Sequence, residues 1–159
     1  MESITQNEKV LYIGIDVHKD TYALCCFDFQ RGQLCYVKST NAPTGGAAYT
    51  FGTSEIIDDS GLWADLTLDG TTPYISYMSK PNAYDGIRIA YFDAELVKTW
   101  NNDGTVKDKG GWNKITVALQ NRANNVRTCI AVASSAVTGW KAAVGYTPGN
   151  VYRVVKYVK

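Results

Sequence analysis

The sequence has little histidine, proline or methionine, and almost no excess of charge of either sign. One histidine, 4 prolines and 2 methionines occur in 159 residues, and 16 basic residues balance 15 acidic ones to a net charge of +1. This balance gives no basis for electrostatic attraction to nucleic acids or anionic membranes. No apolar run approaches the roughly 20 residues of a membrane-spanning helix, and the polar start MESITQNEK lacks the layout of a signal peptide. A cytoplasmic location is therefore expected.

The four cysteines do not have the spacing of a metal site. Cys25, Cys26, Cys35 and Cys129 include no Cys-x-x-Cys pair, and His18 is the only histidine in the sequence. Neighbouring residues of a strand point to opposite faces, so Cys25 and Cys26 are not expected to share a ligand. In a reducing cytosol we expect the thiols to be small buried groups. Cys26 and Cys35 could approach each other across the hairpin predicted below, which would matter if the chain is in an oxidising compartment.

What the chain does contain is typical of an antiparallel β protein. Hydrophobic residues make up 45% of the sequence, with 11 tyrosines and 4 tryptophans, and aromatic and β-branched residues favour pleated sheets. The apolar run VLYIGIDV at 10–17 predicts a strand covered on both faces. Residues 21–39 predict a hairpin with Gly32 in its turn. We therefore predict an all-β fold, an antiparallel meander that begins with a strand and a hairpin.

The composition changes between residues 41 and 60. Proline and glycine interrupt the uncharged stretch NAPTGGAAYTFGTS at 41–54, and SEIIDDSG at 54–61 predicts a short acidic turn or helix. We expect an N-terminal unit at 1–40, a glycine-rich seam at 41–60, and a sheet region at 61–159.

Residues 61–159 alternate short apolar strands with turns. The expected strands are LWADLTLD, PYISYMS, GIRIAYFD and WNKITVAL, and NNDGTVKDKGG at 101–111 is an expected turn. The segments RTCIAVAS, WKAAVGY and VYRVVKYV repeat the first three strands at an offset of about 65 residues, a period typical of stacked or radially arranged sheet units. Amphipathic strands also resemble one another by chance, so both interpretations stay open.

The stretch YIGIDVHKDTYALCCFDF at 12–29 resembles the N-terminal strand and hairpin of DEDD-type insertion-sequence transposases, whose catalytic domain has a RuvC-like, RNase H fold. The resemblance covers residues 9–40. In that family the aspartate of the Gly-Ile-Asp-Val-His-Lys motif ends the first strand and binds catalytic magnesium, and by position this residue is Asp16. The resemblance implies metal-dependent cleavage or transfer of DNA phosphodiesters.

That chemistry needs more than one acid, because a single carboxylate does not hold a pair of divalent ions. By sequence the nearest further acids are Glu55, Asp58 and Asp59, beyond the seam. The other interpretation of Asp16 is a strand-end carboxylate that faces solvent or pairs with Lys19. Our leading prediction therefore has no catalytic residue, no metal and no cofactor. Asp16 as a Mg²⁺ ligand, with the other three acids as catalytic partners, is the alternative.

The stretch WADLTLDGTTPYISYMSKPNAYDGIRIAYFD, within residues 61–159, resembles a blade of a sialidase-like β-propeller. In VKDKGGW at 106–112, Asp108 and Gly110 keep the spacing of that family's Asp-box pattern, which implies a turn-stabilising loop. Sialidase chemistry gathers arginines, a tyrosine nucleophile and an acid from many blades. The chain has material for about two blades and part of a third, so we expect no complete active site in one monomer. Two resemblances in one chain suggest a fusion.

Aromatic side chains and strand edges are the remaining candidates for function. Exposed rings near turns stack on sugars or bases, whereas buried rings close the ends of a sheet core. The near-neutral charge favours a carbohydrate or a protein as the ligand, and nucleic acid only under the transposase alternative. Unpaired edges also invite a second copy of the chain. The candidate ligand-binding residues are Trp63, Trp100, Trp112 and Trp140.

We therefore predict a non-enzymatic binding or interaction module that acts through strand edges and loop aromatics. The first alternative is a metal-dependent DNA-processing enzyme or truncated transposase. The second alternative is a small protein that inhibits a partner enzyme.

Overall fold

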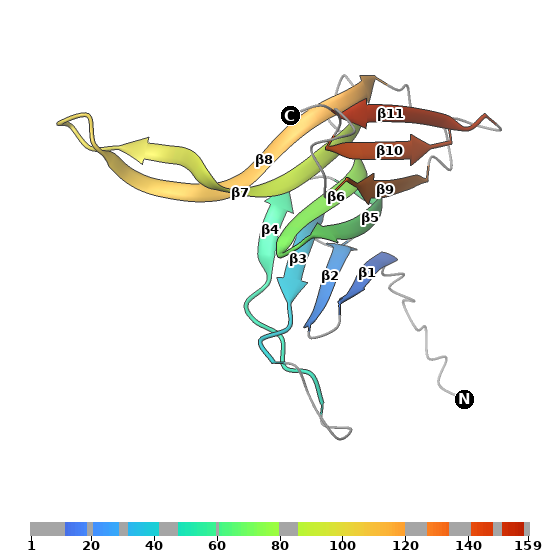
Figure 1. Ribbon diagram of the computed structural model, residues 1–159, viewed down its shortest axis with the longest axis horizontal. Helices are drawn as coiled ribbons and strands as arrows, with labels where there is room; N and C mark the ends of the chain where they lie inside the picture. Colours follow the sequence, from blue (N-terminus) through green and yellow to red (C-terminus); the bar gives the residue numbers. More distant parts are fainter. Residues whose placement is uncertain are drawn as a thin grey trace, which may run out of the picture.

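The predicted all-β architecture is confirmed. The computed structural model describes residues 12–18, 21–28, 32–41, 48–59, 61–79, 86–119, 127–133, 141–147 and 151–157. These ranges contain eleven strands and no helix, and the strands form three antiparallel sheets (Figure 1). Within them, no helix is long and apolar enough to span a membrane.

The first sheet has the order β1-β2-β3-β4 and contains β1 (Tyr12–His18), β2 (Thr21–Asp28), β3 (Gln33–Lys38) and β4 (Glu55–Asp58). The predicted N-terminal strand and hairpin are β1, β2 and β3. Gly32 precedes β3 with a φ of 69°, a left-handed conformation that glycine adopts without steric cost.

The second sheet has the order β5-β6-β7-β8 and contains β5 (Leu62–Asp69), β6 (Thr72–Ser79), β7 (Gly86–Trp100) and β8 (Val106–Leu119). The third sheet has the order β11-β10-β9 and contains β9 (Thr128–Val132), β10 (Ala142–Tyr146) and β11 (Arg153–Tyr157). These three strands coincide with the segments predicted to repeat β5, β6 and β7, and they pair in the corresponding order.

The second sheet lies between the other two, and the part that these sheets cover is buried on both faces. One face packs on the first sheet and forms the first core: Ala23, Cys25, Leu34, Tyr36, Ile57, Leu66, Ile75, Tyr77 and Ala90. The opposite face packs on the third sheet and forms the second core: Tyr74, Met78, Ile87, Ile89, Tyr91, Ala142, Val144 and Tyr146. Burial on both faces explains why β6 reads as an almost unbroken apolar run.

The first strands of the three sheets are neighbours. β1 lies against β5, and β5 lies against β9. A β5 side chain is also bonded to the β9 backbone, since Asp65 Oδ2 accepts a hydrogen bond of 2.9 Å from the Ile130 backbone amide. Successive sheets therefore stack with their first strands on one side of the molecule.

The segment predicted as an acidic turn or helix is instead strand β4, and this prediction was wrong. β4 pairs with β3 and adds a fourth strand to the first sheet, within the range predicted as a seam. Ile57 is buried in the first core. Burial of this β-branched residue and the contacts of its acidic neighbours outweigh the turn-forming tendency of the sequence.

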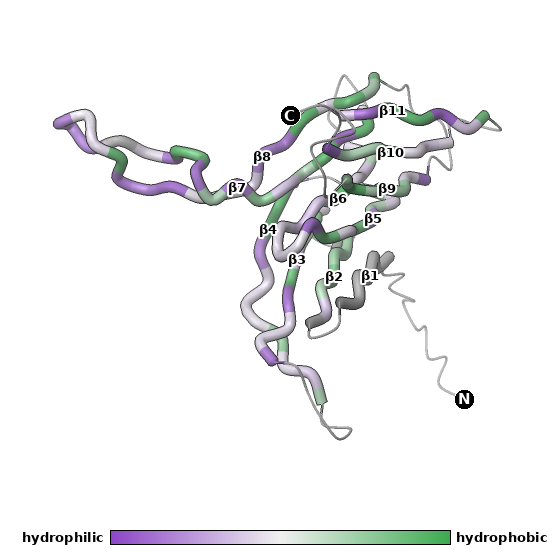
Figure 2. The backbone as a smooth tube through the Cα atoms, viewed as in Figure 1, coloured by the Kyte–Doolittle hydropathy of each residue, from purple (hydrophilic) through white to green (hydrophobic). Residues whose placement is uncertain are grey.

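The prediction of a long turn at 101–111 was also wrong. The turn occupies 101–105, and residues 106–111 belong to β8, so that β7 and β8 form a hairpin arm that extends away from the body (Figure 1). The Asp-box-like segment lies in this strand, where Asp108 pairs with Thr99. The distal arm carries both hydrophilic and hydrophobic residues (Figure 2), with an ion pair of 2.7 Å between Lys109 and Glu95.

Candidate functional site

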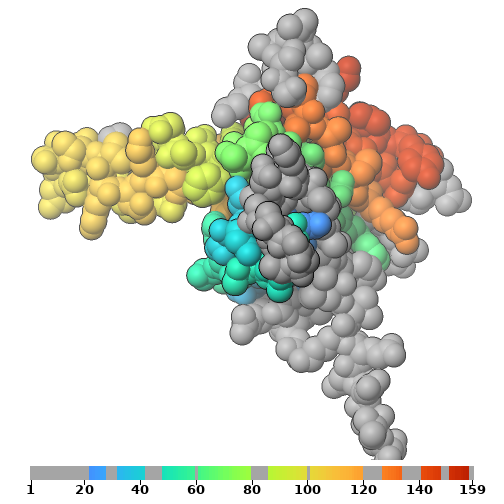
Figure 3. Space-filling view, turned by 60° about the horizontal axis from the view of Figure 1, so that its bottom comes forward, coloured from blue at the N-terminus to red at the C-terminus, as the bar shows by residue number. Residues whose placement is uncertain are grey.

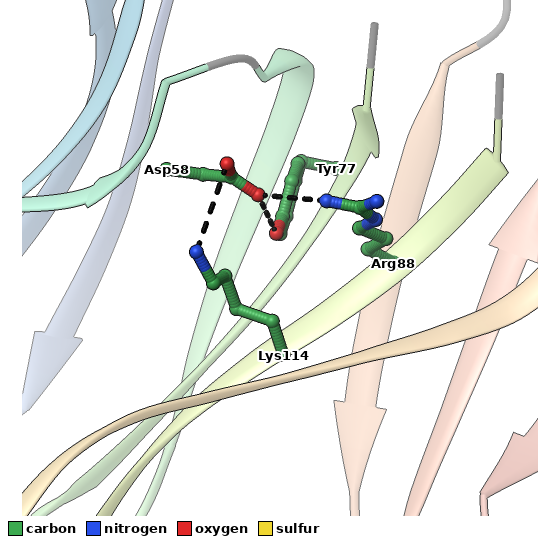
Figure 4. A network of polar contacts seen from close by, with 4 residues as sticks. All are labelled: Asp58, Tyr77, Arg88 and Lys114. Atoms are coloured by element: carbon green, nitrogen blue, oxygen red, sulfur yellow. Dashed lines mark hydrogen bonds and ion pairs between the residues drawn. The ribbon is translucent and has the colours of Figure 1, made fainter. Parts of the chain in front are cut away.

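A polar network lies where the edge of the first sheet meets the second sheet (Figure 4). The Tyr77 hydroxyl donates a hydrogen bond of 2.6 Å to Asp58 Oδ2, and Arg88 Nη1 donates one of 3.1 Å to the same oxygen. Lys114 Nζ lies 3.8 Å from the other carboxylate oxygen. The carboxylate comes from β4, and its partners come from β6, β7 and β8.

The environment of this network favours a protonated tyrosine. The Tyr77 side chain is fully buried, and the Asp58 side chain is 11% exposed. Burial and the hydrogen bond to the carboxylate raise the pKa of Tyr77 well above its ordinary value. A tyrosine nucleophile or base needs the opposite shift. The chemistry of these groups is therefore that of a stable connection between two sheets.

An aromatic cluster lies beside the network, around Trp112. Its Nε1 donates a hydrogen bond of 2.9 Å to Glu55 Oε2. Its ring packs edge-to-face on Tyr36 and Phe92, with centroid distances of 5.2 and 6.0 Å. Trp112 is half-buried against the first core, whereas Phe92 is exposed. We call Trp112 and Phe92 the aromatic patch.

Of the other three predicted tryptophans, only Trp63 has its side chain among the described residues. Trp63 is in β5 at an irregularity in its pairing with β6, with a φ of 56°, and its carbonyl accepts a hydrogen bond of 2.7 Å from Thr128 Oγ1. A left-handed conformation is uncommon for a residue with a side chain. Trp100 is the last residue of β7, but its side chain lies outside the described residues, as does the whole of Trp140.

The strand order separates the acids of the magnesium alternative. Asp16 lies in β1, opposite Ala23, and Glu55 and Asp58 lie in β4 at the other edge of the same sheet. Three strand spacings separate these edges, about 14 Å along a flat sheet. Asp59 directly follows β4 and is exposed. In the part of the chain that the structure describes, no group of three or more histidine, cysteine, aspartate or glutamate residues is placed to hold a metal ion.

Two of the cysteines are brought together. Cys26 lies directly opposite Cys35 in the β2–β3 ladder, as the predicted hairpin implies. Cys25 is buried in the first core, and Cys129 is exposed on β9. The side chain of His18 lies outside the described residues.

A separate cluster of polar and aromatic side chains joins the second and third sheets. The sequence analysis did not single out its residues. Tyr74 stacks on Tyr91 at a centroid distance of 5.4 Å, and Tyr91 lies 6.2 Å from Tyr157 of β11. Lys141 forms an ion pair with Asp69. Burial and a hydrogen bond with Tyr91 raise the pKa of Tyr157 to about 12. Spacing in the sequence does not reveal this cluster, because its members come from four separate segments.

The sequence analysis also did not single out the exposed apolar residues of the edge strands. Tyr152 is 86% exposed and Val154 is 69% exposed, next to or within β11, and Ile56 is 57% exposed on β4. The alternation of apolar and charged residues in VYRVVKYV is the sequence pattern that could have indicated a half-exposed strand there.

Comparison of the chain with protein-family models, curated proteins and solved structures finds no match. The resemblances to transposases and to propeller blades therefore stay predictions.

Proposed function

We propose that this protein is a non-enzymatic binding module, which holds a protein or a carbohydrate through its exposed strand edges and the aromatic patch. The observation that carries this proposal is the exposure of large apolar side chains on two edge strands, Ile56 on β4 and Val154 on β11. Edge strands present backbone donors and acceptors to other chains. Apolar side chains beside them add surface that gains free energy on burial.

The arrangement of the sheets supports blade-like units as the framework of this module. Each sheet is an antiparallel meander, the sheets stack face to face, and their first strands are neighbours. Propeller blades pack around their axis in the same manner. In such a framework, β4 and β11 present edges to a partner or to a second copy of the chain.

The candidate acids support binding more than catalysis. Glu55 is bonded to Trp112, and Asp58 to Tyr77 and Arg88, so both carboxylates already have partners in the fold. Asp16 lies at the far edge of the first sheet. Shared ligands of a divalent ion must converge, so the DNA-processing alternative has less support. The inhibitor alternative remains a special case of protein binding.

A glycan array and an affinity capture experiment, run in parallel, test this proposal. Phe92→Ala should weaken glycan binding if the aromatic patch holds a sugar, and Val154→Lys should weaken capture of a protein if an edge holds it. Lys107→Gln, at an exposed residue of the distal arm away from these surfaces, is the matched control. An inhibitor would also slow the enzyme that it captures.

A nuclease assay with Mg²⁺ or Mn²⁺ is the opposing test. DNA cleavage by the native protein that is lost in Asp16→Ala would reject the proposal.

A further inference from the structure

β8 is an edge strand over its whole length. It is the outermost strand of the second sheet and runs for 14 residues, Val106–Leu119. On one side it pairs with β7, and no other strand in the described part of the chain pairs with it. β4 lies over its face and belongs to the first sheet. We call the unpaired side the β8 edge, and a strand edge of this length presents a row of backbone donors and acceptors to another chain.

Part of this edge belongs to the arm. The arm projects from one side of the body (Figure 1 and Figure 3), and beyond Asp93 the described strands that form it are β7 and β8 alone. Residues 101–109, at its distal end, are all exposed. A hairpin of two strands is only marginally stable in water. A third strand beside β8 would therefore stabilise the arm.

We propose that the β8 edge binds the β8 edge of a second copy of the chain. The two strands pair antiparallel about a twofold axis at Gly111, so that the arm of each copy lies along the body of the other. This inference goes beyond the proposed function, which assigns the β4 and β11 edges and the aromatic patch to a different ligand.

The charges of β8 specify this register. In a symmetric antiparallel pair the residue at the axis lies opposite its own counterpart, because directly opposite side chains share a face of the sheet. With Gly111 at the axis, Asp108 of each copy lies opposite Lys114 of the other. Asp108 is the only acid in β8, so no other axis within the strand places an acid opposite a base. An axis at Asp108 itself would place Lys107 opposite Lys109, and like charges oppose pairing.

Both charged groups are available for this contact. The Asp108 side chain is 57% exposed, and its Oδ2 lies 4.0 Å from Lys98 Nζ. The Lys114 side chain is 41% exposed, and its Nζ lies 3.8 Å from Asp58 Oδ1. Arg88 is the closer cation to that carboxylate, at 3.1 Å. Asp58 therefore faces two cations, and an acid from a second copy would balance the more distant one.

The two glycines of β8 suit a position at the axis. Glycine within a strand often marks a site where another backbone approaches closely. In this register Gly110 of each copy lies opposite Trp112 of the other, next to the axis at Gly111. An aromatic side chain opposite an edge glycine stabilises strand pairing.

Sedimentation equilibrium of the full chain at several concentrations tests this inference. The protein should form a dimer, with twice the chain mass of 17.5 kDa. Asp108→Lys should raise the dissociation constant of the dimer at least tenfold, because it places a base opposite a base at two sites. Lys107→Asp is the matched control and should leave the constant nearly unchanged, since this neighbouring residue lies opposite Ile115.

A mixture of two variants identifies the contact itself. Lys114→Asp alone should also weaken the dimer, because it places an acid opposite an acid. An equimolar mixture of Asp108→Lys and Lys114→Asp should form a heterodimer, because each base then lies opposite an acid.

Cross-linking decides the question if circular dichroism shows that a charge variant does not fold. Two copies of Gly111→Cys should become linked through the new thiols on oxidation, as detected by peptide mapping. Thr99→Cys, on the other strand of the arm, should not link in this way.

Several results would overturn the inference. They are a chain that stays monomeric at every concentration, a dimer that Asp108→Lys leaves intact or that Lys107→Asp weakens equally, and a mixture of folded variants that stays monomeric. Absence of the Gly111→Cys link, or equal linking of Thr99→Cys, would also overturn it. A dimer that Val154→Lys dissociates would assign the contact to β11 instead. Glycan binding and protein capture are measured separately, so their failure concerns the proposed function and not this dimer.

Discussion

The Tyr77 hydroxyl and the Asp58 carboxylate are joined by a hydrogen bond of 2.6 Å that links β6 of the second sheet to β4 of the first. The alternation of apolar and polar residues in the sequence predicts the individual strands but does not predict that these two residues meet. It also shows why β4 is a strand, since a carboxylate held by Tyr77 and Arg88 has a fixed position against the second sheet.

Removing this carboxylate should destabilise the protein more than removing the phenol. We expect Asp58→Ala to lower the free energy of unfolding by about 2–4 kcal/mol, because it leaves a buried hydroxyl and a partly buried guanidinium without their acceptor. Tyr77→Phe should cost about 1–3 kcal/mol. Urea denaturation measures both values. Asp59→Ala, at the exposed neighbour, is the control, and an equal effect of the two aspartate substitutions would contradict this role.

Stability should fall at alkaline pH. The pKa of Tyr157 is raised to about 12 in the folded chain, above the ordinary value of 10.0, so the folded state keeps a proton that the unfolded state releases. The stabilisation is fully present below pH 10 and is lost as the pH rises toward 12. Tyr77, whose pKa is raised further, extends the loss in the same direction.

Denaturation measured at several pH values between 9 and 12 checks this prediction. Tyr157→Phe should reduce the slope of stability against pH, whereas Tyr152→Phe, at an exposed tyrosine, should not. A stability that stays constant above pH 10 would contradict it.

Two adjacent glycines at the base of the arm should respond differently to alanine. Gly110 has a φ of 85°, and an added Cβ would lie 3.5 Å from both Phe92 Cζ and the Ala94 carbonyl oxygen, so Gly110→Ala should cost about 1–2 kcal/mol. At Gly111 the added Cβ would meet Lys98 Cε at 2.8 Å, the far end of a flexible side chain that can move. Gly111→Ala should therefore cost less than about 0.5 kcal/mol. Thermal denaturation of both variants compares them, and the reverse order would be inconsistent with this backbone.

Oxidation should join Cys26 to Cys35. Directly opposite residues of an antiparallel pair have Cα atoms about 4.5–5.5 Å apart, within the range that a disulfide spans. The bond would close a loop of about 10 residues and add at most about 3 kcal/mol of stability.

Peptide mapping under non-reducing conditions detects this bond as a loss of two hydrogens. Cys35→Ser should abolish it, and Cys129→Ser should leave it unchanged. A bond that instead includes Cys129 would contradict the pairing.

Several parts of the fold follow from the sequence because their causes are local. A short apolar segment with flanking turn residues predicted β5 with its observed bounds, and Gly32 marked the turn between β2 and β3. The β2–β3 hairpin in turn places Cys26 opposite Cys35, because register follows from the turn.

Contacts between distant segments decided the rest. NNDGTVKDKGG is rich in turn-forming residues, yet its second half is part of β8, where Asp108 and Lys109 pair with Thr99 and Val97 of β7. SEIIDDSG became β4 because Ile57 is buried. The sequence by itself determined an all-β chain, most of its strands and its near-neutral charge. Only the tertiary structure decided that Asp58 meets Tyr77 and Arg88 and that Asp16 and Glu55 lie at opposite edges of the first sheet, since these depend on how the sheets stack and on the strand order, and not on any local pattern.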